Sequence, residues 1–565
     1  MKGRQSILNS AGLFLEPPTA YSDVHVPASQ GLNKHTGVDA ALWLLLPLAV
    51  LWWTPIGGFS GDGVAQLTTY MNGTWALNPN HLLYEPIGAG WLSMAHVADV
   101  AGAIARLKRL SFLSGSLALA LFRLLLASRI TTSRLQANLA TAWLIVPAAV
   151  LGLLLSDETE IVQLPSLVLL AFAIYMHANK PSWRAALALG VAGGLTALFY
   201  ISNALICVTC VLVLGVLFWK RDRRSTVTTV LASAAGALIV VIPSMLVAWV
   251  IAAPRTTAFF RWITTYGGGK AVRIGAAGYG VGHSPRDIAI AFARAIYGSA
   301  TALVDISGVV TSAQSTGTID AKTTAALIVL LIGIMLVAVM LLYAFRQSDP
   351  TARPWFIALA IGWTLGVLAF GVYWNNSDDQ FFFQLAIPLA ITAAAAMRVK
   401  MWPSVIGLCC LLGWNGYATL WSYATYPRAR YVADLAREAR AANLLIFPGD
   451  DAIHALMIFV PQTQDHSQLA ITRLAERLPA GSGVQLLRDS VANVLKRGGT
   501  VSTVSIIDAS PDQNPWKYLQ SLGYDYSTIK KALTDVSVVC PSHLVGPWDS
   551  NWLRHIGRSN SEYCH

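Results

Sequence analysis

The chain has 565 residues, of which 55% are hydrophobic and only 12% are charged, and its mean hydropathy is +0.53. Soluble domains carry about 25% charged residues, so this composition excludes a soluble enzyme and predicts a multispanning membrane protein. The formal net charge of +11 follows partly from the basic residues that membrane proteins place in cytoplasmic loops, so it does not indicate a nucleic-acid partner.

Apolar runs recur along the chain, and a membrane span needs roughly 20 mostly apolar residues. We predict an α-helical polytopic fold of about eleven spans. They lie near residues 40–56, 111–128, 137–155, 161–177, 185–200, 203–219, 226–252, 322–345, 354–374, 381–397 and 402–421. No cleavable signal peptide is expected, because the first apolar run begins late and no small-residue cleavage pattern follows it.

Basic residues predict the orientation of the chain. Alternate short loops hold Arg129 and Arg134, Lys180 and Arg184, Lys220 to Arg224, Arg346 and Arg353, and Arg398 and Lys400. Because cytoplasmic loops are rich in Lys and Arg, these loops are expected on the cytoplasmic side. The N-terminal tail is then cytoplasmic, and the segment after Tyr423 is extracytoplasmic.

Three parts are expected along the chain: a cytoplasmic tail at 1–39, a transmembrane domain at 40–423 and an extracytoplasmic domain at 424–565. In the last part, helix-like patterns at 430–442 and 484–496 alternate with strand-like runs at 444–447, 500–507 and 536–539. This alternation predicts a small soluble α/β domain. Cys540 and Cys564 both lie there, and the sequence leaves open whether they form a disulfide.

Acidic residues gather in the loops predicted on the outer side. The first of these loops holds Asp62, which lies between two glycines, together with Glu85 and Asp99. Two further outer loops hold Asp157, Glu158 and Glu160, and then Asp378 and Asp379. Ionisable groups at a membrane are costly and usually functional. The competing interpretation is simple solvation of the loop ends.

The outer loop at residues 253–321 is unusually basic and rich in glycine. It contains Arg255, Arg261, Lys270, Arg273, His283, Arg286 and Arg294 on the side that is normally poor in Lys and Arg. Cations on a flexible backbone suit an anionic ligand such as a phosphate. Contact with lipid headgroups is the alternative. Residues 285–304 are predicted to form an amphipathic helix at the interface.

These features together resemble the GT-C glycosyltransferases, which include polyprenyl-phosphate-dependent protein mannosyltransferases and lipid A aminoarabinose transferases. Asp62 stands where those families place a catalytic Asp, just after the first span. The segment Asn78–Tyr84 resembles one in many bacterial members, and Asp157, Glu158 and Glu160 stand where many members carry a second acid. The Asp-x-Asp or Glu-x-Asp form of some relatives is absent at Asp62, so a requirement for Mg or Mn is left open.

The resemblance implies a protein of the bacterial inner membrane that transfers a sugar from a polyprenyl-phosphate donor. The acceptor would be a hydroxyl on a cell-envelope glycan, lipid or protein. Asp62 would be the general base, and Glu158 or Glu160 would orient the acceptor or a metal.

Further residues are expected to bind the substrates. The predicted contacts are His81, Tyr84 and Glu85 in the first outer loop, Arg261, Lys270, Arg273, His283 and Arg286 in the basic loop, and Asp378. His81 and Tyr84 share a face if residues 79–92 form a helix, since they are three positions apart.

Two other functions compete with this one. A transporter or flippase of a lipid-linked or anionic substrate predicts ionisable residues near the middle of spans. Arg123 is the main such residue, and it lies towards the cytoplasmic end of its span. A polysaccharide ligase or polymerase shares the outer-face chemistry, and the sequence separates it poorly from a transferase.

Overall fold

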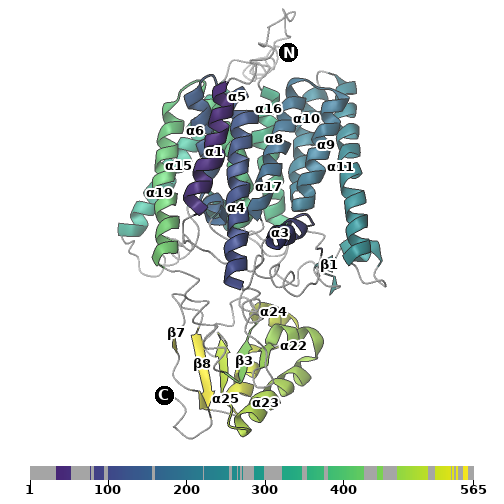
Figure 1. The fold of residues 1–565 in the computed structure, drawn as a ribbon, viewed down its shortest axis with the longest axis vertical. Helices are drawn as coiled ribbons and strands as arrows, with labels where there is room; N and C mark the ends of the chain where they lie inside the picture. Colours follow the sequence, from purple (N-terminus) through teal and green to yellow (C-terminus); the bar gives the residue numbers. More distant parts are fainter. Residues whose placement is uncertain are drawn as a thin grey trace, which may run out of the picture.

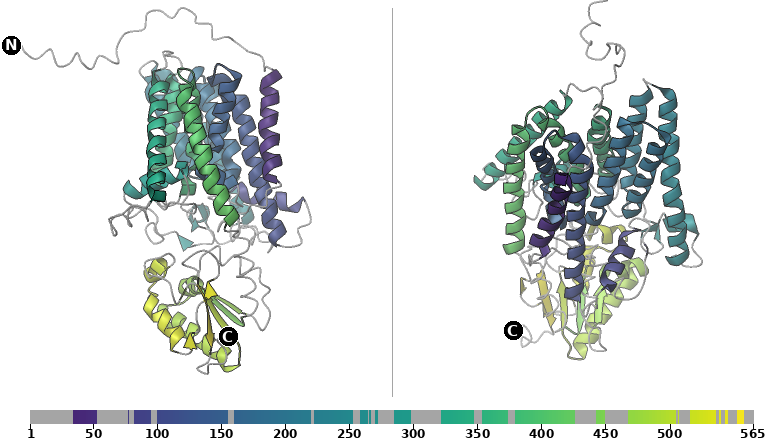
Figure 2. Two further views of the ribbon diagram at one scale, coloured as in Figure 1. Left: turned by 90° about the vertical axis from the view of Figure 1, so that its left-hand side faces the viewer. Right: turned by 45° about the horizontal axis from the view of Figure 1, so that its top comes forward.

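The computed structural model describes residues 34–52, 77, 82–94, 100–154, 160–219, 222–252, 258–263, 265–266, 270–271, 285–297, 321–346, 353–373, 379–425, 442–448, 467–504, 506, 516–535, 538–539, 543–544 and 552–557. These residues form a bundle of helices with a mixed β-sheet beyond one end of it (Figure 1). The same arrangement is seen from two further directions in Figure 2.

The first half of the bundle is formed by α1 (Lys34–Trp52), α4 (Val100–Phe122), the π-helical turn η2 (Arg123–Ala127), α5 (Ser128–Ile130), α6 (Arg134–Ile145), α7 (Ala148–Leu154), the 3₁₀ turn η3 (Glu160–Gln163), α8 (Leu164–Asn179), α9 (Trp183–Phe199), α10 (Asn203–Trp219) and α11 (Arg223–Ala252). Capping serines explain the starts of two helices. The hydroxyl of Ser133 accepts a hydrogen bond from the Gln136 N–H before α6, and Ser182 caps α9 in the same way.

The second half is formed by α15 (Ala321–Phe345), α16 (Arg353–Ile357), the π-helical turn η4 (Ala358–Gly362), α17 (Trp363–Tyr373), the 3₁₀ turn η5 (Asp379–Leu385), α18 (Ala386–Met397) and α19 (Trp402–Thr425). Three short helices and a hairpin lie between the long ones: α3 (Tyr84–Ser93), α12 (Phe259–Ile263), β1 (Thr265–Tyr266), β2 (Lys270–Ala271) and α13 (Pro285–Tyr297).

Helical segments coincide with all eleven apolar runs predicted to be spans. Within the described residues, four helices are both long and apolar enough to cross a membrane: 105–130, 160–179, 223–251 and 354–371. Five further apolar helices are shorter. The number of spans therefore stays a prediction, while a helical, multi-pass membrane fold is what the structure supports.

The span predicted near 137–155 is formed by two helices and not by one straight helix. Helices α6 and α7 meet at a bend of 72°. Pro147 stands in the break between them, and proline both lacks a backbone N–H and clashes with the preceding helical turn. The break leaves the carbonyl of Val146 free for a side chain, and Asn415 of α19 donates a 2.8 Å hydrogen bond to it.

Successive long helices alternate in direction, so the bundle has two distinct ends (Figure 1). The α3 face is the end at which α3 lies and α8, α10 and α18 begin. The Asp39 face is the opposite end, where α6, α9 and α11 begin. The basic loops that were predicted to be cytoplasmic all lie at the Asp39 face. Arginines there stack on tryptophans, Arg184 on Trp183 at 5.4 Å and Arg223 on Trp219 at 5.1 Å, as is common at membrane interfaces.

Helices α9 and α11 pack through glycines, as helices within membranes commonly do. A Cβ at Gly190 would lie 1.9 Å from the carbonyl oxygen of Ser233, and a Cβ at Gly236 would lie 2.3 Å from that of Leu187. Neither position tolerates a side chain at this separation. A glycine on each helix, Gly190 on α9 and Gly236 on α11, therefore allows the two backbones to approach this closely.

Residues 442–557 contain a six-stranded sheet. Its strands are β3 (Leu444–Phe447), β4 (Ser467–Ala470), β5 (Val501–Val504), β6 (Val538–Val539), β7 (His543–Leu544) and β8 (Trp552–Gly557), in the spatial order β4-β3-β5-β8-β6 with β7 also on β8. β3 is parallel to both β4 and β5, whereas β8 is antiparallel to its neighbours. Strands β3, β5 and β6 fall within or overlap the runs predicted from the sequence.

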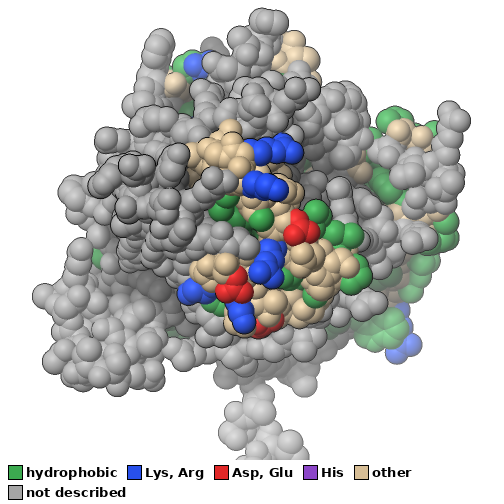
Figure 3. Space-filling model, turned by 90° about the horizontal axis from the view of Figure 1, so that it is seen from below, with side chains coloured by type: hydrophobic (Ala, Val, Ile, Leu, Met, Phe, Trp, Pro, Cys, Tyr) green, Lys and Arg blue, Asp and Glu red, His purple; other side chains and the backbone are tan. Residues whose placement is uncertain are grey.

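Helices α22 (Ile471–Arg477), α23 (Ala480–Lys496), α24 (Trp516–Ser521) and α25 (Tyr526–Thr534) accompany this sheet. Helix α23 buries Leu487, Val491 and Leu495, which recur every four residues along one face, in a hydrophobic core shared with β3, β5 and α25. Charged side chains of both signs are interspersed on the surface seen from this end of the molecule (Figure 3).

Candidate functional site

Helix α3 is attached to the bundle at both of its ends. The N–H of Leu83, just before the helix, donates a 3.0 Å hydrogen bond to the carbonyl of Leu198 at the end of α9. Near the other end, the Trp91 indole N–H donates to the Arg106 carbonyl at 2.7 Å, and Arg106 Nε donates to the Trp91 carbonyl at 3.0 Å. The Arg106 guanidinium also stacks on the Trp91 ring. These contacts fix α3 across the ends of α4 and α9.

The helix expected over 79–92 begins later than predicted, at Tyr84. The three-residue spacing therefore does not place His81 and Tyr84 on one helical face. Tyr84 is 2% exposed and belongs to the hydrophobic core of the bundle. Glu85 lies in the first turn of α3. Asp62 and His81 lie outside the described residues.

Glu160 is the one predicted catalytic acid that the structure describes. It is the first residue of η3, so the helix begins inside the acidic cluster, and it is 2% exposed. Elements α4, α7, α8 and α9 pack around η3. Neither carboxylate oxygen has a hydrogen-bond partner within the described part of the chain. Asp157 and Glu158 lie outside the described residues.

A buried polar network follows Glu160 and was missed by the sequence analysis. The amide of Asn203, at the start of α10, donates to the side-chain oxygen of Gln163 in η3 and, at 3.0 Å, to the carbonyl of Thr196 in α9. The Ser166 hydroxyl donates to the Gln163 carbonyl at 2.7 Å. Gln163 and Asn203 are both buried. Amides inside apolar runs are the sequence signal that was available for this network.

Helix α12, which belongs to the basic loop, packs against residues that come before α3. Trp262 of α12 packs in one hydrophobic cluster with Leu77 and Leu82, which come before α3, and with Leu198 of α9. Arg261 therefore lies on an element beside the first outer loop. Lys270 lies in β2, opposite Tyr266 of β1. Arg273 and His283 are outside the described residues.

Helix α13 carries Arg286 in its first turn and lies within the helix predicted over 285–304, of which residues 298–304 are outside the described residues. Its buried face includes Ala291, Ala295 and Ile296, and Asn415 donates a 2.7 Å hydrogen bond to the Ile296 carbonyl. Because α13 packs against η5 and α7, it lies beside the turn that begins directly after Asp378. Asp378 itself is outside the described residues.

The elements that carry the predicted site residues thus gather at the α3 face, where α3, η3, α12, α13 and η5 lie. Among the described residues, no three His, Cys, Asp or Glu side chains form a group able to hold a metal ion. Asp62, Asp157, Glu158 and Asp378 are not among those residues, so the requirement for Mg or Mn stays open. Cys207 and Cys210 are buried and Cys409 and Cys410 exposed, whereas Cys540 and Cys564 are outside the described residues.

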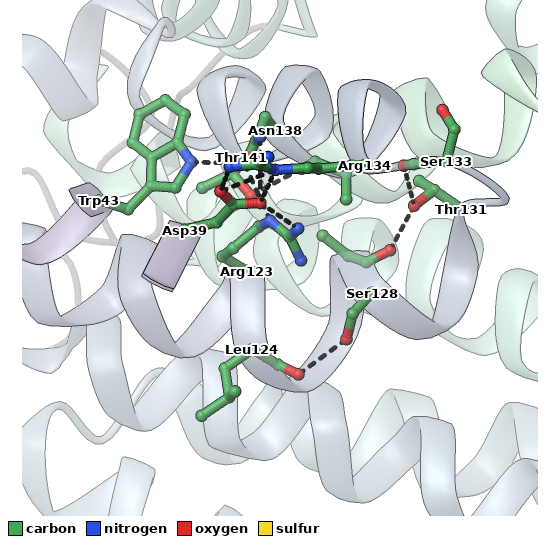
Figure 4. Close-up of polar contacts among 12 residues, drawn as sticks. Asp39, Trp43, Arg123, Leu124, Ser128, Thr131, Ser133, Arg134, Asn138 and Thr141 are labelled. Atoms are coloured by element: carbon green, nitrogen blue, oxygen red, sulfur yellow. Dashed lines mark hydrogen bonds and ion pairs between the residues drawn. The ribbon is translucent and has the colours of Figure 1, made fainter. Parts of the chain in front are cut away.

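A second charged cluster lies at the opposite end of the bundle (Figure 4). Asp39 was placed in the N-terminal tail, but α1 begins at Lys34 and Asp39 is 2% exposed. Its carboxylate accepts 2.6 Å hydrogen bonds from Arg123 and from Arg134. Asn138 joins them by accepting from Arg123 Nε at 2.9 Å and from the Trp43 indole at 3.1 Å. This cluster connects α1 to η2 and α6.

Comparison with known proteins addresses the fold. No protein-family model and no curated sequence matches the chain. The structure of ArnT from Cupriavidus metallidurans bound to undecaprenyl phosphate aligns with a TM-score of 0.51 at 11% identity, over 92% of this chain and 97% of that one.

Two other solved structures are less similar. The oligosaccharyltransferase of Archaeoglobus fulgidus in its apo form aligns with a TM-score of 0.45 at 12% identity, over 94% of this chain and 74% of that one. The protein O-mannosyltransferase Pmt1–Pmt2 complex of S. cerevisiae bound to the sugar donor aligns with a TM-score of 0.32 at 16% identity, over 47% and 37%. The fold assignment rests on ArnT, and by that likeness the chain has the fold of a GT-C membrane glycosyltransferase.

Proposed function

We propose that this protein is a membrane glycosyltransferase that moves a sugar from a polyprenyl-phosphate donor to an acceptor hydroxyl at the α3 face. The ArnT structure that shares its fold holds undecaprenyl phosphate. The observation that carries the proposal is Glu160, a buried carboxylate with no partner among the described residues, on the face where α3, α12, α13 and η5 also lie. Burying a charged group without a partner costs free energy, so we expect a group of the substrate to hydrogen-bond to this carboxylate.

The reaction follows from the chemistry of the donor. The acceptor oxygen attacks the anomeric carbon, and the bond from that carbon to the phosphate oxygen breaks with its electron pair. Asp62 takes the acceptor proton, because a carboxyl with a pKa of about 3.9 is ionised at neutral pH. A positioned general base contributes typically about 10²–10⁴-fold. Glu160, or Glu158, orients the acceptor.

The departing polyprenyl phosphate gains negative charge, and the basic loop supplies the cations to stabilise it. Arg261, Lys270 and Arg286 lie on α12, β2 and α13, and Arg273 belongs to the same loop. Cations held in place beside the developing negative charge lower the activation barrier of the transfer more than cations in water would. A site at one end of the bundle also lets the lipid chain stay in the bilayer while the sugar meets the acceptor.

We place the α3 face on the extracytoplasmic side and the Asp39 face in the cytoplasm. The basic loops at the Asp39 face favour this orientation. The sheet of residues 442–557 would then be a soluble extracytoplasmic α/β domain beside the active site. The bacterial inner membrane is the setting that fits a polyprenyl-phosphate donor and an envelope acceptor.

The positions of the buried ionisable residues favour a transferase over a transporter. The buried Asp, Glu, Arg and His side chains of the described residues are Asp39, Arg123, Glu160 and His177. Asp39, Glu160 and His177 lie within five residues of an end of their helical segments, and Arg123 lies seven residues before the end of the helix 105–130. A transport path predicts such groups near the middle of the bundle instead.

The direct test is release of undecaprenyl phosphate, which every such donor yields whatever its sugar and acceptor. Purified protein in liposomes is given a panel of undecaprenyl-phosphate sugars and an envelope extract as acceptor. Asp62→Asn should lower the rate by about 10²–10⁴-fold, and Glu160→Gln should also lower it unless Glu158 holds that role. Asp222→Asn, an exposed change at the Asp39 face, is the matched control. No release by wild type on any donor, or full activity of Asp62→Asn, would refute the proposal.

A further inference from the structure

The 3₁₀ geometry of η3 couples the direction in which the Glu160 side chain points to the direction of the Gln163 side chain. In a 3₁₀-helix the side chains at positions i and i+3 lie one above the other. Glu160 and Gln163 are the first and fourth residues of η3, so they emerge from the same edge of the turn. Whatever holds Gln163 therefore also limits how η3 can rotate, and with it where the Glu160 carboxylate points.

Asn203 holds Gln163. Its side-chain amide donates one hydrogen to the Gln163 side-chain oxygen and the other to the Thr196 carbonyl, 3.0 Å away. Both donors of the amide are thus used, and Asn203 is 0% exposed. The bond to Thr196 fixes the Asn203 side chain to α9, so η3 is held against a helix rather than against a loop.

The same end of α9 also holds α3. Two residues beyond Thr196, the carbonyl of Leu198 accepts the Leu83 N–H at 3.0 Å. One short stretch of α9 is therefore the common support of η3, which carries Glu160, and of α3, which carries Glu85. Asn203 is the side chain that connects η3 to this support.

We propose that Asn203 is a positioning residue that, through Gln163, sets the direction of the Glu160 carboxylate towards the acceptor. This inference rests on the glycosyltransferase function proposed above. Stability alone does not explain this network, because the Asn203 side-chain oxygen is buried and has no partner among the described residues. Replacing both members of a buried hydrogen-bonded pair by apolar groups of similar shape is often nearly neutral, so an apolar pair would serve packing equally well.

The test therefore separates stability from catalysis with the double variant Gln163→Met, Asn203→Leu. The Thr196 carbonyl keeps a partner in that variant, because it also accepts the Tyr200 N–H at 3.2 Å. The unfolding temperature should stay close to that of wild type. The kcat for undecaprenyl phosphate release should fall about 10- to 100-fold, the scale of a misplaced catalytic group, while the KM for the donor stays unchanged. Ser116→Ala is the matched control, since the Ser116 hydroxyl is buried in α4, which packs against η3, and has no partner among the described residues.

Each outcome decides the matter. A double variant that folds and keeps the wild-type kcat overturns the proposal, as does Glu160→Gln with wild-type kcat, and in both cases the proposed function stands. If the double variant does not fold, Gln163→Met alone carries the test, because Asn203 then still donates to Thr196 and only its link to η3 is lost. If wild type releases no undecaprenyl phosphate from any donor, the proposed function fails and this inference falls with it.

Discussion

Removing the Asp39 carboxylate should destabilise the protein more than any other single change at that end of the bundle. Asp39 lies between two arginines with N–O distances of 2.6 Å to each. The Arg123 side chain is 3% exposed, whereas that of Arg134 is 55% exposed. In Asp39→Ala the Arg134 guanidinium can turn to water, but Arg123 stays buried as an unpaired charge with Nη1 already lacking a partner among the described residues.

Breaking a buried ion pair from one side costs about 3–5 kcal/mol, and we expect about 3 kcal/mol here because Asn138 still accepts from Arg123 Nε. Arg134→Ala should have a clearly smaller effect, since Asp39 keeps its buried partner and the lost side chain is half exposed. The double variant Asp39→Leu, Arg123→Met should be milder than Asp39→Ala, because it removes the buried charge as well as its partner.

Reversible unfolding in mixed detergent and SDS micelles, followed by tryptophan fluorescence, gives these free-energy differences. The order of the three variants is the decisive result. If Arg134→Ala is as damaging as Asp39→Ala, or if the double variant is no milder than Asp39→Ala, the cluster is not held together by a buried charge on Arg123.

Three further predictions follow from particular contacts. Gly190→Ala should prevent α9 and α11 from packing together, since its Cβ would lie 1.9 Å from a backbone carbonyl oxygen, and the folded fraction on size-exclusion chromatography should fall. Gly413→Ala is the control and should behave as wild type, because there is open space around its Cβ. Arg106→Leu should release the end of α3, seen as faster hydrogen exchange of its amides, with the Leu83 end unaffected. Asp525 caps the start of α25, and hydrogen bonds from the Ser527 hydroxyl and the Thr528 N–H lower the pKa of its carboxyl. Asp525→Ala should therefore lower the unfolding temperature of α25 at neutral pH. The difference between wild type and variant should shrink as the pH falls through that lowered pKa.

Much of the membrane fold was predictable because its signals are local. Apolar runs located the helical segments, and the Lys and Arg residues of alternate loops predicted which helix ends lie together. The bend at Pro147 was missed because a proline inside an apolar run can also be tolerated, as Pro243 is within α11. The start of α3 at Tyr84 was missed because no capping side chain marks it.

The site was only partly predictable because its supports are long-range. Glu160 was predicted as a site residue from its charge and its place at a helix start, and the structure shows that it is buried there. Gln163 and Asn203 are 40 positions apart, and nothing local in either segment signals that they bond. Asn415 bonds to Ile296, 119 positions away. Pairings of this kind depend on which helices are neighbours, which one sequence without homologues does not reveal.

The unused acceptors in the bundle distinguish its two ends. Most buried oxygens without a partner in the described residues lie near the α3 face, on Glu160, Ser202, Asn203, Gln384 and Asn415, and one more, on Ser116, lies in the middle of α4. Arg123 Nη1 and His177 Nδ1 are unpartnered nearer the Asp39 face. Each buried, unpartnered acceptor costs about 1–3 kcal/mol, so a fold that keeps several at one end gains nothing from them in stability. Groups that accept hydrogen bonds are what a sugar or another hydroxyl-bearing acceptor would need there. These acceptors are what the proposed transferase would use to bind its acceptor, whereas the paired charges of the Asp39 cluster hold the fold together.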